Sequence, residues 1–537
     1  RVFAMSETRR EFLKSIAAPK LPTIEAPIKP PNSDVPLPLP APAPSLAVHA
    51  ANRLMFGPKP GDIDHISTVG YSAFLEEQLN PAAIDDSACD ALLNALPHET
   101  FSETRAQLFD RREMDYYSSI APILQTRYAT VTRMVNSKRQ LFERMVEFWH
   151  NHFNVFGFDY IIQSMFSDWD KLIRTHALGN FRQFLEATTR HPCMLYYLDQ
   201  YISTDGGPNE NYSRELLELQ TLGAINYRVP GGYEDEDVYE TSRCLTGWTF
   251  DYDSQSANRG NFKYIDGDHD RFQKFVLGKQ IPSNQPPQKD GTDLLDLVAN
   301  HPGTALHIAR KLWVRFISDS PDNSACKDIA NVFIAAKSQP DQILRTLRAL
   351  LNHAAFTGQA YRKMGRPDQQ FENCAMVKFK RPIDWVVSTM RALGIPYVAP
   401  TDNFNFDWIY DPMGMSMFGW RPPNGPPDLA VEWANSNNFM RRWNFIFPIA
   451  AGWYDGTGFT YSVTGIMPGA LRTPREIATF WVQRILGRTP SEATQNALVD
   501  FVADGRDYDT PISQEQIDDK LPHLAALCTV TPEFMRR

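Results

Sequence analysis

Histidine and glutamate side chains that could ligate a metal lie close together between residues 143 and 153. Glu147 and His150 are three residues apart, so on a helix they share one face, which is the spacing of carboxylate–imidazole metal ligands. His152 lies roughly 200° around the helix from His150, so both imidazoles reach one ion only where the helix ends or distorts. The chain has no second Glu-x-x-His, which disfavours a di-iron bundle and leaves a mononuclear metal site of His150, His152 and a distant carboxylate. The alternative is an amphipathic helix whose polar end bonds to a neighbouring loop.

A second group of ionisable residues lies in the segment 208–223, which has the pattern of a helix. Arg214 is four residues from both Glu210 and Glu218, so the three side chains share a helix face, and Glu215 lies beside them. An arginine between two carboxylates is ordinarily a structural ion-pair network. The functional interpretation is a catalytic site in which a carboxylate serves as metal ligand or general base, with four candidate residues: Glu210, Arg214, Glu215 and Glu218.

A third polar stripe is predicted on the helix at 234–246, where every third residue is ionisable: Asp237, Glu240 and Arg243. The acidic residues that open this helix favour its positive N-terminal end. Downstream, Asp268-His269-Asp270 offers another imidazole–carboxylate pair in a loop. We expect the three motifs, which span about 140–275, to meet in one buried charged cluster. Imidazole and carboxylate together suit zinc, iron or manganese, and such an ion would activate water or polarise a substrate oxygen.

The elements that position these motifs are mostly helices. After Ser45 apolar residues recur at three- and four-residue spacing, which is the period of amphipathic helices. The clearest pattern runs from about 123 to 153, and similar patterns occur at about 66–80, 103–119, 166–189, 211–222, 234–246, 301–318, 325–337, 341–351, 380–394, 429–446, 473–486 and 514–528. Residues 248–252 and 261–265 are predicted to pair as a hairpin. The sequence therefore predicts a mainly α fold, a large multi-helix globular domain with one small β-hairpin insertion.

Two longer segments are predicted to be loops. Residues 281–291 have the composition of a surface loop and could subdivide the helical domain, which spans 46–537. Residues 411–428 are rich in Pro and Gly and carry Trp420 and Arg421. Long ordered loops of this kind contribute to binding sites more often than short loops do.

Composition excludes several classes of protein. With 43% hydrophobic residues in 537, the chain has enough apolar material for a large core. Its net charge of −9, without a dense Lys/Arg run, argues against binding to nucleic acid. Six scattered cysteines without a C-x-x-C pair make a disulfide framework or a thiolate zinc site improbable. No stretch of about 18 apolar residues occurs, so no transmembrane helix is expected.

The N-terminal segment predicts export. Arg9-Arg10 within residues 8–14 is similar to a twin-arginine signal, although the apolar segment that should follow is degenerate. Residues 1–18 are therefore interpreted as a leader, with a periplasmic or extracellular destination. Residues 19–45 form a Pro-rich arm or linker, since ten prolines fall between 19 and 44, and proline favours extended polyproline-like backbone.

Taken together, the motifs resemble those of the bacterial family known as domain of unknown function 1800. The resemblance rests on segments that run through nearly the whole chain from about Ala47: 148–153, 209–223, 231–233, 245–248, 269–270, 277–278, 381–382 and 419–420. Members are typically exported, which agrees with the interpretation of Arg9-Arg10. Where the family pattern usually has histidine before Thr-Leu-Gly, this chain has Gln220. The resemblance implies no reaction, because the family has no settled activity.

Two main functional hypotheses follow. The first is an exported, metal-dependent enzyme whose site is lined by His150, His152, Glu210, Glu215 and Glu218. The competing hypothesis is a non-catalytic scaffold or partner of another exported protein, in which the charged cluster only fixes helix register. A weaker alternative is a carbohydrate-binding protein that offers Trp149, Trp248 and Trp420 as flat apolar faces to a sugar.

Overall fold

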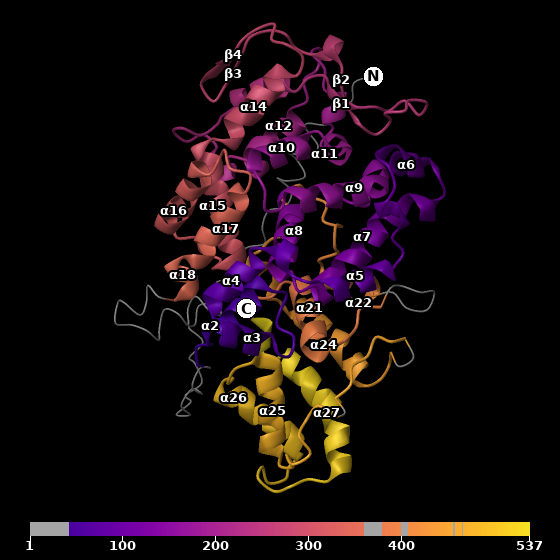
Figure 1. Ribbon diagram of the computed structural model, residues 1–537, viewed down its shortest axis with the longest axis vertical. Helices are drawn as coiled ribbons and strands as arrows, with labels where there is room; N and C mark the ends of the chain where they lie inside the picture. The colour runs from indigo at the N-terminus through magenta and orange to yellow at the C-terminus, as the bar shows by residue number, and fades with distance from the viewer. Residues whose placement is uncertain (1–41, 359–377, 399–405, 455–456, 464) are drawn as a thin grey trace, which may run out of the picture. The chain divides into compact units, whose positions relative to one another are not determined.

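Helices make up most of the chain in the computed structural model, which describes residues 42–358, 378–398, 406–454, 457–463 and 465–537. The predicted leader (1–18) and most of the predicted arm (19–45) lie outside the described residues. The strands among the described residues form two antiparallel pairs, so the predicted mainly α fold is confirmed (Figure 1). None of the described helices is both long and apolar enough to cross a lipid bilayer.

The first part of the fold consists of short and medium helices. They are α2 (Leu46–Leu54), α3 (Asp62–Val69), α4 (Tyr71–Gln78), α5 (Ser87–Asn94), α6 (Arg105–Asp110), α7 (Tyr116–Asn136), α8 (Gln140–His152), α9 (Tyr160–His176), α10 (Phe181–Thr189), α11 (Pro192–Tyr197), α12 (Glu210–Glu215) and α13 (Asp235–Cys244). A π-helix, Leu216–Gln220, continues directly from α12. Two hairpins follow: β1 (Trp248–Phe250) with β2 (Phe262–Tyr264), and β3 (Lys274–Val276) with β4 (Lys279–Ile281).

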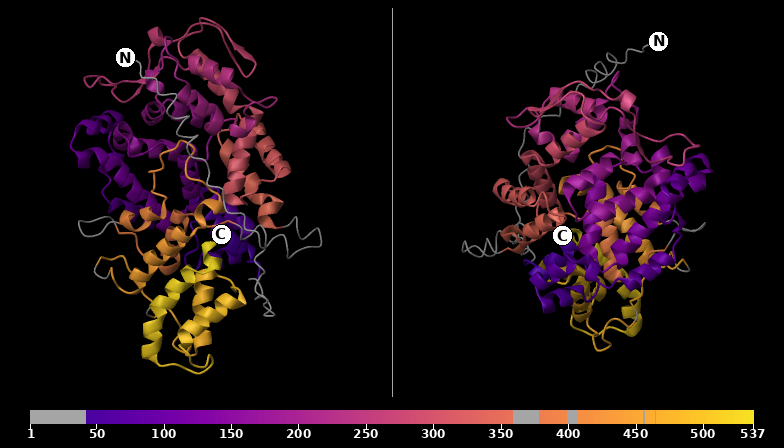
Figure 2. Two further views of the ribbon diagram at one scale, coloured as in Figure 1. Left: turned by 180° about the vertical axis from the view of Figure 1, so that it is seen from behind. Right: turned by 45° about the horizontal axis from the view of Figure 1, so that its top comes forward.

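The remaining elements are again helical. They are α14 (Lys289–Ala299), α15 (Pro302–Phe316), α16 (Asn323–Ala335), α17 (Gln342–Asn352), α18 (Ala354–Thr357), α21 (Pro382–Leu393), α22 (Asp407–Tyr410), α23 (Ala430–Trp433), α24 (Ser436–Ala450), α25 (Pro474–Leu486), α26 (Glu492–Ala503), α27 (Gln514–Thr529) and α28 (Pro532–Met535). Figures 1 and 2 show α25, α26 and α27 together at the end of the fold away from the hairpins.

The stretch expected to be one long helix at 123–153 is broken into α7 and α8. Gln140 is the first residue of α8, directly after the break, and its side-chain amide donates to the backbone carbonyls of Met134 and Ser137. Asp86 accepts hydrogen bonds from the Ser137 hydroxyl and the Lys138 backbone N–H. These bonds satisfy backbone groups that a continuing helix would have paired, so the chain turns without leaving them orphaned.

The predicted hairpin is confirmed as β1–β2, but a second hairpin, β3–β4, was not predicted. Its turn is formed by Leu277 and Gly278, which both have positive φ (51° and 69°). Tight hairpin turns of this kind usually carry Asn-Gly or Asp-Gly, because leucine is rarely found at positive φ. With three-residue strands and an atypical turn, the segment lacked the sequence signal of a hairpin.

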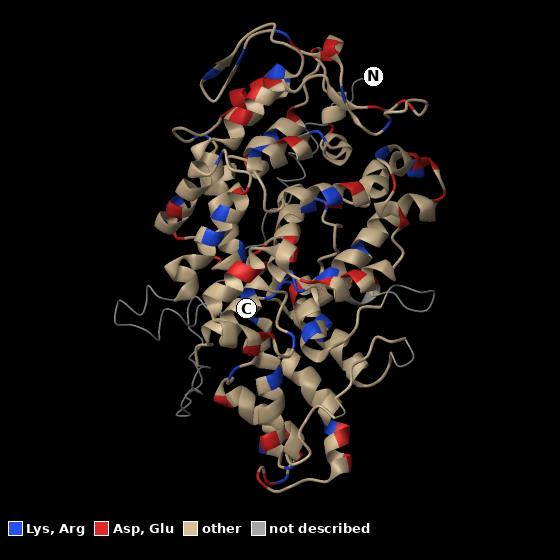
Figure 3. Cartoon of the chain, viewed as in Figure 1, with Lys and Arg blue, Asp and Glu red and all other residues tan. Residues whose placement is uncertain are grey.

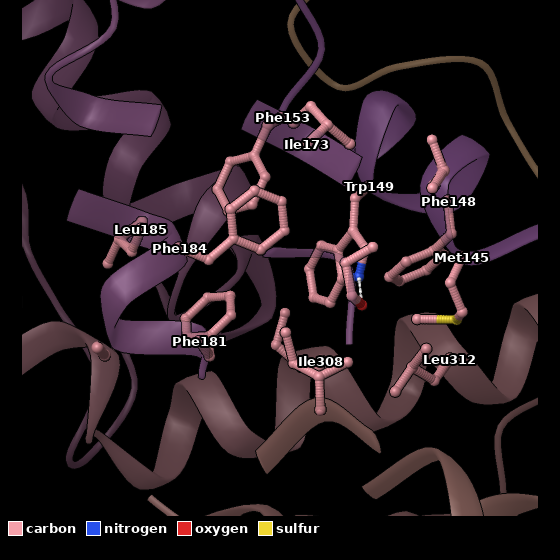
Figure 4. Packing of buried hydrophobic residues seen from close by; sticks show 14 of the residues in the cluster. Met145, Phe148, Trp149, Phe153, Ile173, Phe181, Phe184, Leu185, Ile308 and Leu312 are labelled. Carbon is pink, nitrogen blue, oxygen red and sulfur yellow. Dashed lines mark hydrogen bonds between the residues drawn. The ribbon is translucent and has the colours of Figure 1, made fainter. Parts of the chain in front are cut away.

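Buried apolar side chains form two clusters. The first is built from residues 50–356, and the second mainly from residues 379–535 with Phe56 and a few side chains of α7. The segment 281–291 joins β4 to α14 within the first cluster. The indole of Trp149 on α8 lies at the centre of a group of aromatic and aliphatic side chains from α8, α10 and α15, and its Nε1 donates to the Ala177 carbonyl at 2.8 Å (Figure 4).

Candidate functional site

His150 is buried on α8 and pairs with a carboxylate of the next helix. Its Nε2 lies 2.9 Å from Asp170 Oδ1 on α9, and its ring packs between Phe166 and Phe418. Asp170 also accepts a hydrogen bond from Arg174, at 2.8 Å. Burial acts to raise the pKa of Asp170, but Arg174 and His150 outweigh burial and hold that pKa well below its usual range. His150 is therefore one member of a buried Asp–His pair.

His152 has a different environment, although it is only two residues away. Its Nε2 lies 3.1 Å from the Gln220 carbonyl oxygen, and His307 Nε2 on α15 lies 3.0 Å from the Leu219 carbonyl oxygen. Burial lowers the pKa of both imidazoles, and that of His307 falls to about 3. Both rings are therefore neutral at physiological pH, and each donates from Nε2 to a carbonyl at the end of the π-helix. The structure thus matches the alternative in which a polar helix end bonds to a neighbouring segment.

The π-helix replaces the last turn of the α-helix predicted at 211–222. Thr221 Oγ1 donates to the Leu216 carbonyl at 2.6 Å, and the Gly223 backbone N–H donates to the Leu217 carbonyl at 2.9 Å. Gly223 has a φ of 89°, and a Cβ there would lie only 2.4 Å from His307 Nδ1. A glycine is therefore required for His307 to reach the Leu219 carbonyl. Single π-turns of this kind are frequent at functional sites.

Three of the four predicted catalytic residues, Glu210, Arg214 and Glu215, lie on α12, and Glu218 lies on the π-helix that follows it. Glu210 is exposed, and Arg214 forms ion pairs with Glu210 (3.5 Å) and with Asp235 of α13 (3.3 Å). Burial, together with the nearby charge of Glu218, raises the pKa of Glu215 to about 7. Among the described residues, neither Glu215 nor Glu218 forms a hydrogen bond or ion pair with His150 or His152.

The polar stripe of α13 holds the unpredicted hairpin in place. Asp237 Oδ1 accepts from the Leu277 backbone N–H at 2.6 Å, and Glu240 Oε2 accepts from the Phe275 backbone N–H at 2.8 Å. Arg243 pairs with Asp270 at 2.7 Å. His152 of the first motif thus contacts Gln220 of the second, and Arg214 of the second contacts Asp235 of the third. The three motifs do not form the single buried charged cluster that we expected. The reason is that most of these carboxylates bind backbone amides or arginines of their own neighbourhood.

Metal binding by His150 and His152 remains a prediction. Their Nε2 atoms face separate partners, Asp170 and the Gln220 carbonyl. In the part of the chain that the structure describes, no group of three or more His, Cys, Asp or Glu side chains is placed to hold a metal ion. The hypothesis that three tryptophans offer flat apolar faces to a sugar is wrong for two of them, because Trp149 and Trp248 are 0% exposed. Only Trp420 is half-buried.

A buried ionic cluster that the sequence did not reveal lies where α8, α15 and α21 meet. Asp384 is paired with Arg144 (2.5 Å) and Arg381 (2.8 Å), and Glu147 with Arg315 (2.5 Å) and Arg381 (3.0 Å). The three arginines are at most 1% exposed. Burial acts to raise the pKa of Asp384, but Arg381 and Arg144 hold it far below its usual range. Elsewhere acidic and basic residues are interspersed over the ribbon (Figure 3).

The loop 411–428 forms a wall of two cavities on either side of Asn151. A cavity of about 30 Å³ is lined by Glu143, Glu147 and His150 and is closed by residues 415–418 of the loop. An open pocket of about 240 Å³ lies between the end of α8, α15 and residues 424–428. Gly425, at φ 70°, allows this close approach, since a Cβ there would lie 2.1 Å from the Asn151 carbonyl oxygen. The expectation that this loop borders a potential ligand site thus has a geometric basis.

The 240 Å³ pocket, here called the cationic pocket, is lined by eleven residues: Phe148, Asn151, His152, Arg310, Lys311, Val314, Arg315, Asn424, Pro426, Pro427 and Asp428. Three of these are basic and one is acidic. Asp428 is bound to Arg315 (3.2 Å) and Arg381 (3.3 Å), so its charge is already shared. Arg315 is bound to Glu147 as well, so the positive charges of the pocket that no described carboxylate pairs are those of Arg310 and Lys311.

Lys311 distinguishes this pocket from the other charged groups. No hydrogen bond or ion pair joins its Nζ to another described residue, whereas Arg310 and Arg315 bind Asn323 and Glu147. Burial lowers the pKa of Lys311 to about 8; Asp428 acts to raise this pKa and Arg315 to lower it. A basic group in a pocket with a shifted pKa and no protein partner is a candidate for ligand contact.

A larger hollow, of about 750 Å³, lies between residues 58–64 and α25. Two of its ionisable side chains, Arg475 and Glu476, are engaged locally. Arg475 pairs with Asp509, and Glu476 accepts hydrogen bonds from Thr473 at the start of α25. This hollow contains no histidine, and its volume alone does not indicate chemistry.

Sequence reasoning placed 301–318 on a helix but did not identify Arg310, Lys311 and Arg315 as site residues. Their spacing, three cations within two turns, was the available signal.

A model of the family described as "Protein of unknown function (DUF1800)" matches residues 49–536. No curated protein and no solved structure matches the chain.

Proposed function

The chain belongs to the DUF1800 family, and from this premise we propose that it is an exported protein that binds a small anionic ligand in the cationic pocket. The observation that carries the proposal is the Lys311 ammonium, which no described residue binds and which lies beside Arg310 and Arg315 in a pocket with one shared carboxylate. Export is supported by Arg9-Arg10 and by the family resemblance. The periplasm or the extracellular space is the proposed location.

Charge and size define the class of ligand. Leaving an ammonium partly buried without a counterion is costly, and an anion that enters the pocket removes this cost. Asn151 and Asn424 also line the pocket; Asn424 can contribute an amide donor, and Asn151 keeps one N–H beside the one that it donates to Glu147. The volume of about 240 Å³ is below the range of roughly 300–1,000 Å³ that accommodates drug-sized ligands. A compact carboxylate, phosphate or sulfate ester fits these properties.

The metal-dependent form of the enzyme hypothesis is not part of this proposal. It would require His150 and His152 to turn from Asp170 and from the Gln220 carbonyl toward one point. Asp170 and Gln220 are buried, so this turn would cost the Asp170 carboxylate and the Gln220 carbonyl one hydrogen bond each, worth about 1 kcal/mol or more. The neutral imidazole of His152 and the lysine amine can instead serve as acid–base groups of the chain itself.

Sulfate binding measured by isothermal titration calorimetry tests the proposal. We expect the full chain to bind sulfate, and Lys311→Met to weaken binding by about tenfold or more, because a buried charge partner is lost. Lys171→Met is the matched control, since Lys171 is exposed on α9 and should leave affinity unchanged. Equal affinity in all three proteins, or no binding by the unaltered chain at low ionic strength, would contradict an anion site at Lys311.

The pH dependence of sulfate binding gives a second prediction. Sulfate keeps its charge above pH 6, whereas Lys311, with a pKa of about 8, loses its positive charge as pH rises. Because the anion prefers the protonated lysine, affinity should be nearly constant from pH 6 to 7 and fall above pH 8, by up to about tenfold per pH unit. In Lys311→Arg the affinity should stay flat over this range, since arginine remains charged. A flat profile in the unaltered chain would overturn the assignment.

A partner-protein function remains the second candidate because of one observation. Large apolar side chains are exposed on α23, α24 and the turn that follows: Val431 (76%), Met440 (66%), Trp443 (46%) and Trp453 (76%). Exposed apolar groups of this kind often mark protein contacts. If this function is correct, Trp443→Ala should abolish association with the partner in cross-linked extracts of the natural host. Sulfate binding should not change.

A further inference from the structure

The Lys311 amine has an environment that favours covalent chemistry as well as charge pairing. Building on the proposed anion site, we propose that its ligand carries a carbonyl group next to the anionic group, and that Lys311 Nζ condenses with this carbonyl to form an imine. The class of ligand is thus a small oxo acid or an anionic aldehyde. Nζ supplies the nucleophile, and Arg310, Arg315 and the asparagine amides bind the anion.

The arrangement of α15 supports separate roles for its cations. His307, Lys311 and Arg315 follow one another at four-residue spacing and so share one helix face. Arg315 is held by Glu147 and Asp428, and Arg310 by Asn323, so both guanidinium groups are fixed. Lys311 has no such bond to a described residue, and its flexible side chain can reach a ligand atom in the pocket. The fixed arginines are suited to orient the anionic group of the ligand. Lys311, which no described residue binds, is suited to attack the carbonyl group next to it.

Lysine at this position differs from arginine in one property that matters here. Both provide positive charge, but only lysine can lose its proton in the neutral pH range. With a pKa of about 8, about a tenth of the Lys311 side chains are free amines at pH 7, compared with well under a thousandth for an exposed lysine. Partial burial and adjacent cationic groups are the conditions that activate lysine toward carbonyl compounds.

The reaction balances without an oxidant or a cofactor. The Nζ lone pair attacks the carbonyl carbon, so a C–N bond forms and the carbonyl π pair moves to oxygen. A proton passes from nitrogen to that oxygen and gives a carbinolamine. The nitrogen then gives up its remaining proton, a proton is delivered to the hydroxyl oxygen, the C–O bond breaks so that this oxygen leaves as water, and the nitrogen lone pair forms the C=N bond. His152 lines the same pocket, and its Nδ1, which has no partner among the described residues, is available to accept a proton.

Reductive trapping with glyoxylate and sodium cyanoborohydride tests this inference on the full chain. Peptide mass spectrometry should find a carboxymethyl group on Lys311 at pH 7, formed about tenfold or more faster than on exposed Lys171 in the same sample. Excess sulfate should suppress labelling of Lys311 but not of Lys171. In Lys311→Arg the peptide that contains residue 311 should stay unlabelled, while Lys171 should react at its normal rate.

The outcomes separate this inference from the proposed function. If sulfate binds in a Lys311-dependent manner but Lys311 is labelled no faster than Lys171, the imine inference is wrong and the anion site stands. If sulfate does not bind and Lys311 is not preferentially labelled, both are wrong. Because Lys311→Arg keeps the charge and the length of the side chain, its melting temperature shows directly whether the fold is intact.

Discussion

Replacement of Asp384 by alanine should lower the free energy of unfolding by about 3–5 kcal/mol, because it removes the carboxylate partner of buried Arg144 and one of the carboxylate partners of buried Arg381. Asp384 is 2% exposed and bonds both Arg144 and Arg381, which are themselves at most 1% exposed. Water cannot replace the lost carboxylate at such a site, and the remaining acid, Glu147, already pairs with Arg315 and Arg381. Urea denaturation followed by tryptophan fluorescence measures the loss.

The control for this experiment is the exposed ion pair of Arg475 with Asp509, 2.8 Å apart. Asp509→Ala should leave the denaturation midpoint within experimental error, because solvent screens exposed pairs. Arg144→Met with Asp384→Leu should recover part of the loss, since Arg144 and its carboxylate partner are then removed together. Similar small effects of Asp384→Ala and Asp509→Ala would show that the ionic cluster is not required for stability.

Replacement of Trp149 by alanine should also cost about 3–5 kcal/mol, as expected for a large buried aromatic side chain. The indole is 0% exposed, it packs against Phe181 and Phe184, and its Nε1 bonds the Ala177 carbonyl (Figure 4). The cavity and the orphaned carbonyl both contribute. Since Trp149 directly precedes His150 on α8 and its indole contacts the His152 ring (5.2 Å between ring centroids), the end of α8 should loosen, and sulfate affinity should fall with stability.

Two further variants make this prediction specific. Trp149→Phe keeps most of the apolar volume and should cost less than half as much as Trp149→Ala, because it loses mainly the hydrogen bond and one ring. Trp453→Ala removes the same type of side chain from the surface, where it is 76% exposed, and should change the unfolding free energy by less than about 0.5 kcal/mol. Equal destabilisation by Trp149→Ala and Trp453→Ala would contradict the packing described for α8.

The fold class was predictable because helical periodicity is a local property. The hydrophobic spacing located most helices and the β1–β2 hairpin, whereas β3–β4 was missed because Leu277 occupies a turn position that usually carries asparagine or aspartate. The break between α7 and α8 was missed for another reason. Gln140 and Asp86 satisfy the polar groups there. Asp86 binds Ser137, which is far from it in sequence, and a contact between such distant residues leaves no periodic signal in the sequence.

The candidate site was only partly predictable. Sequence spacing drew attention to His150 and His152, and both lie at cavity walls. Their partners, Asp170 and the Gln220 carbonyl, could not be identified, because nothing in a sequence shows which acids or carbonyl groups fold back onto a helix. A charged residue on an amphipathic helix is normally assigned to the solvent side. Lys311 was overlooked for this reason, since only the tertiary structure places it in a pocket with the loop 411–428.

An anomalous diffraction experiment with selenate, a close analogue of sulfate, tests the anion site most directly. Crystals of the full chain, grown without sulfate or phosphate and soaked in selenate, should show a selenium peak in the cationic pocket within hydrogen-bonding reach of Lys311 Nζ, and crystals of Lys311→Met should lose this peak. An empty pocket, with selenium found only beside exposed arginines such as Arg475, would contradict the account.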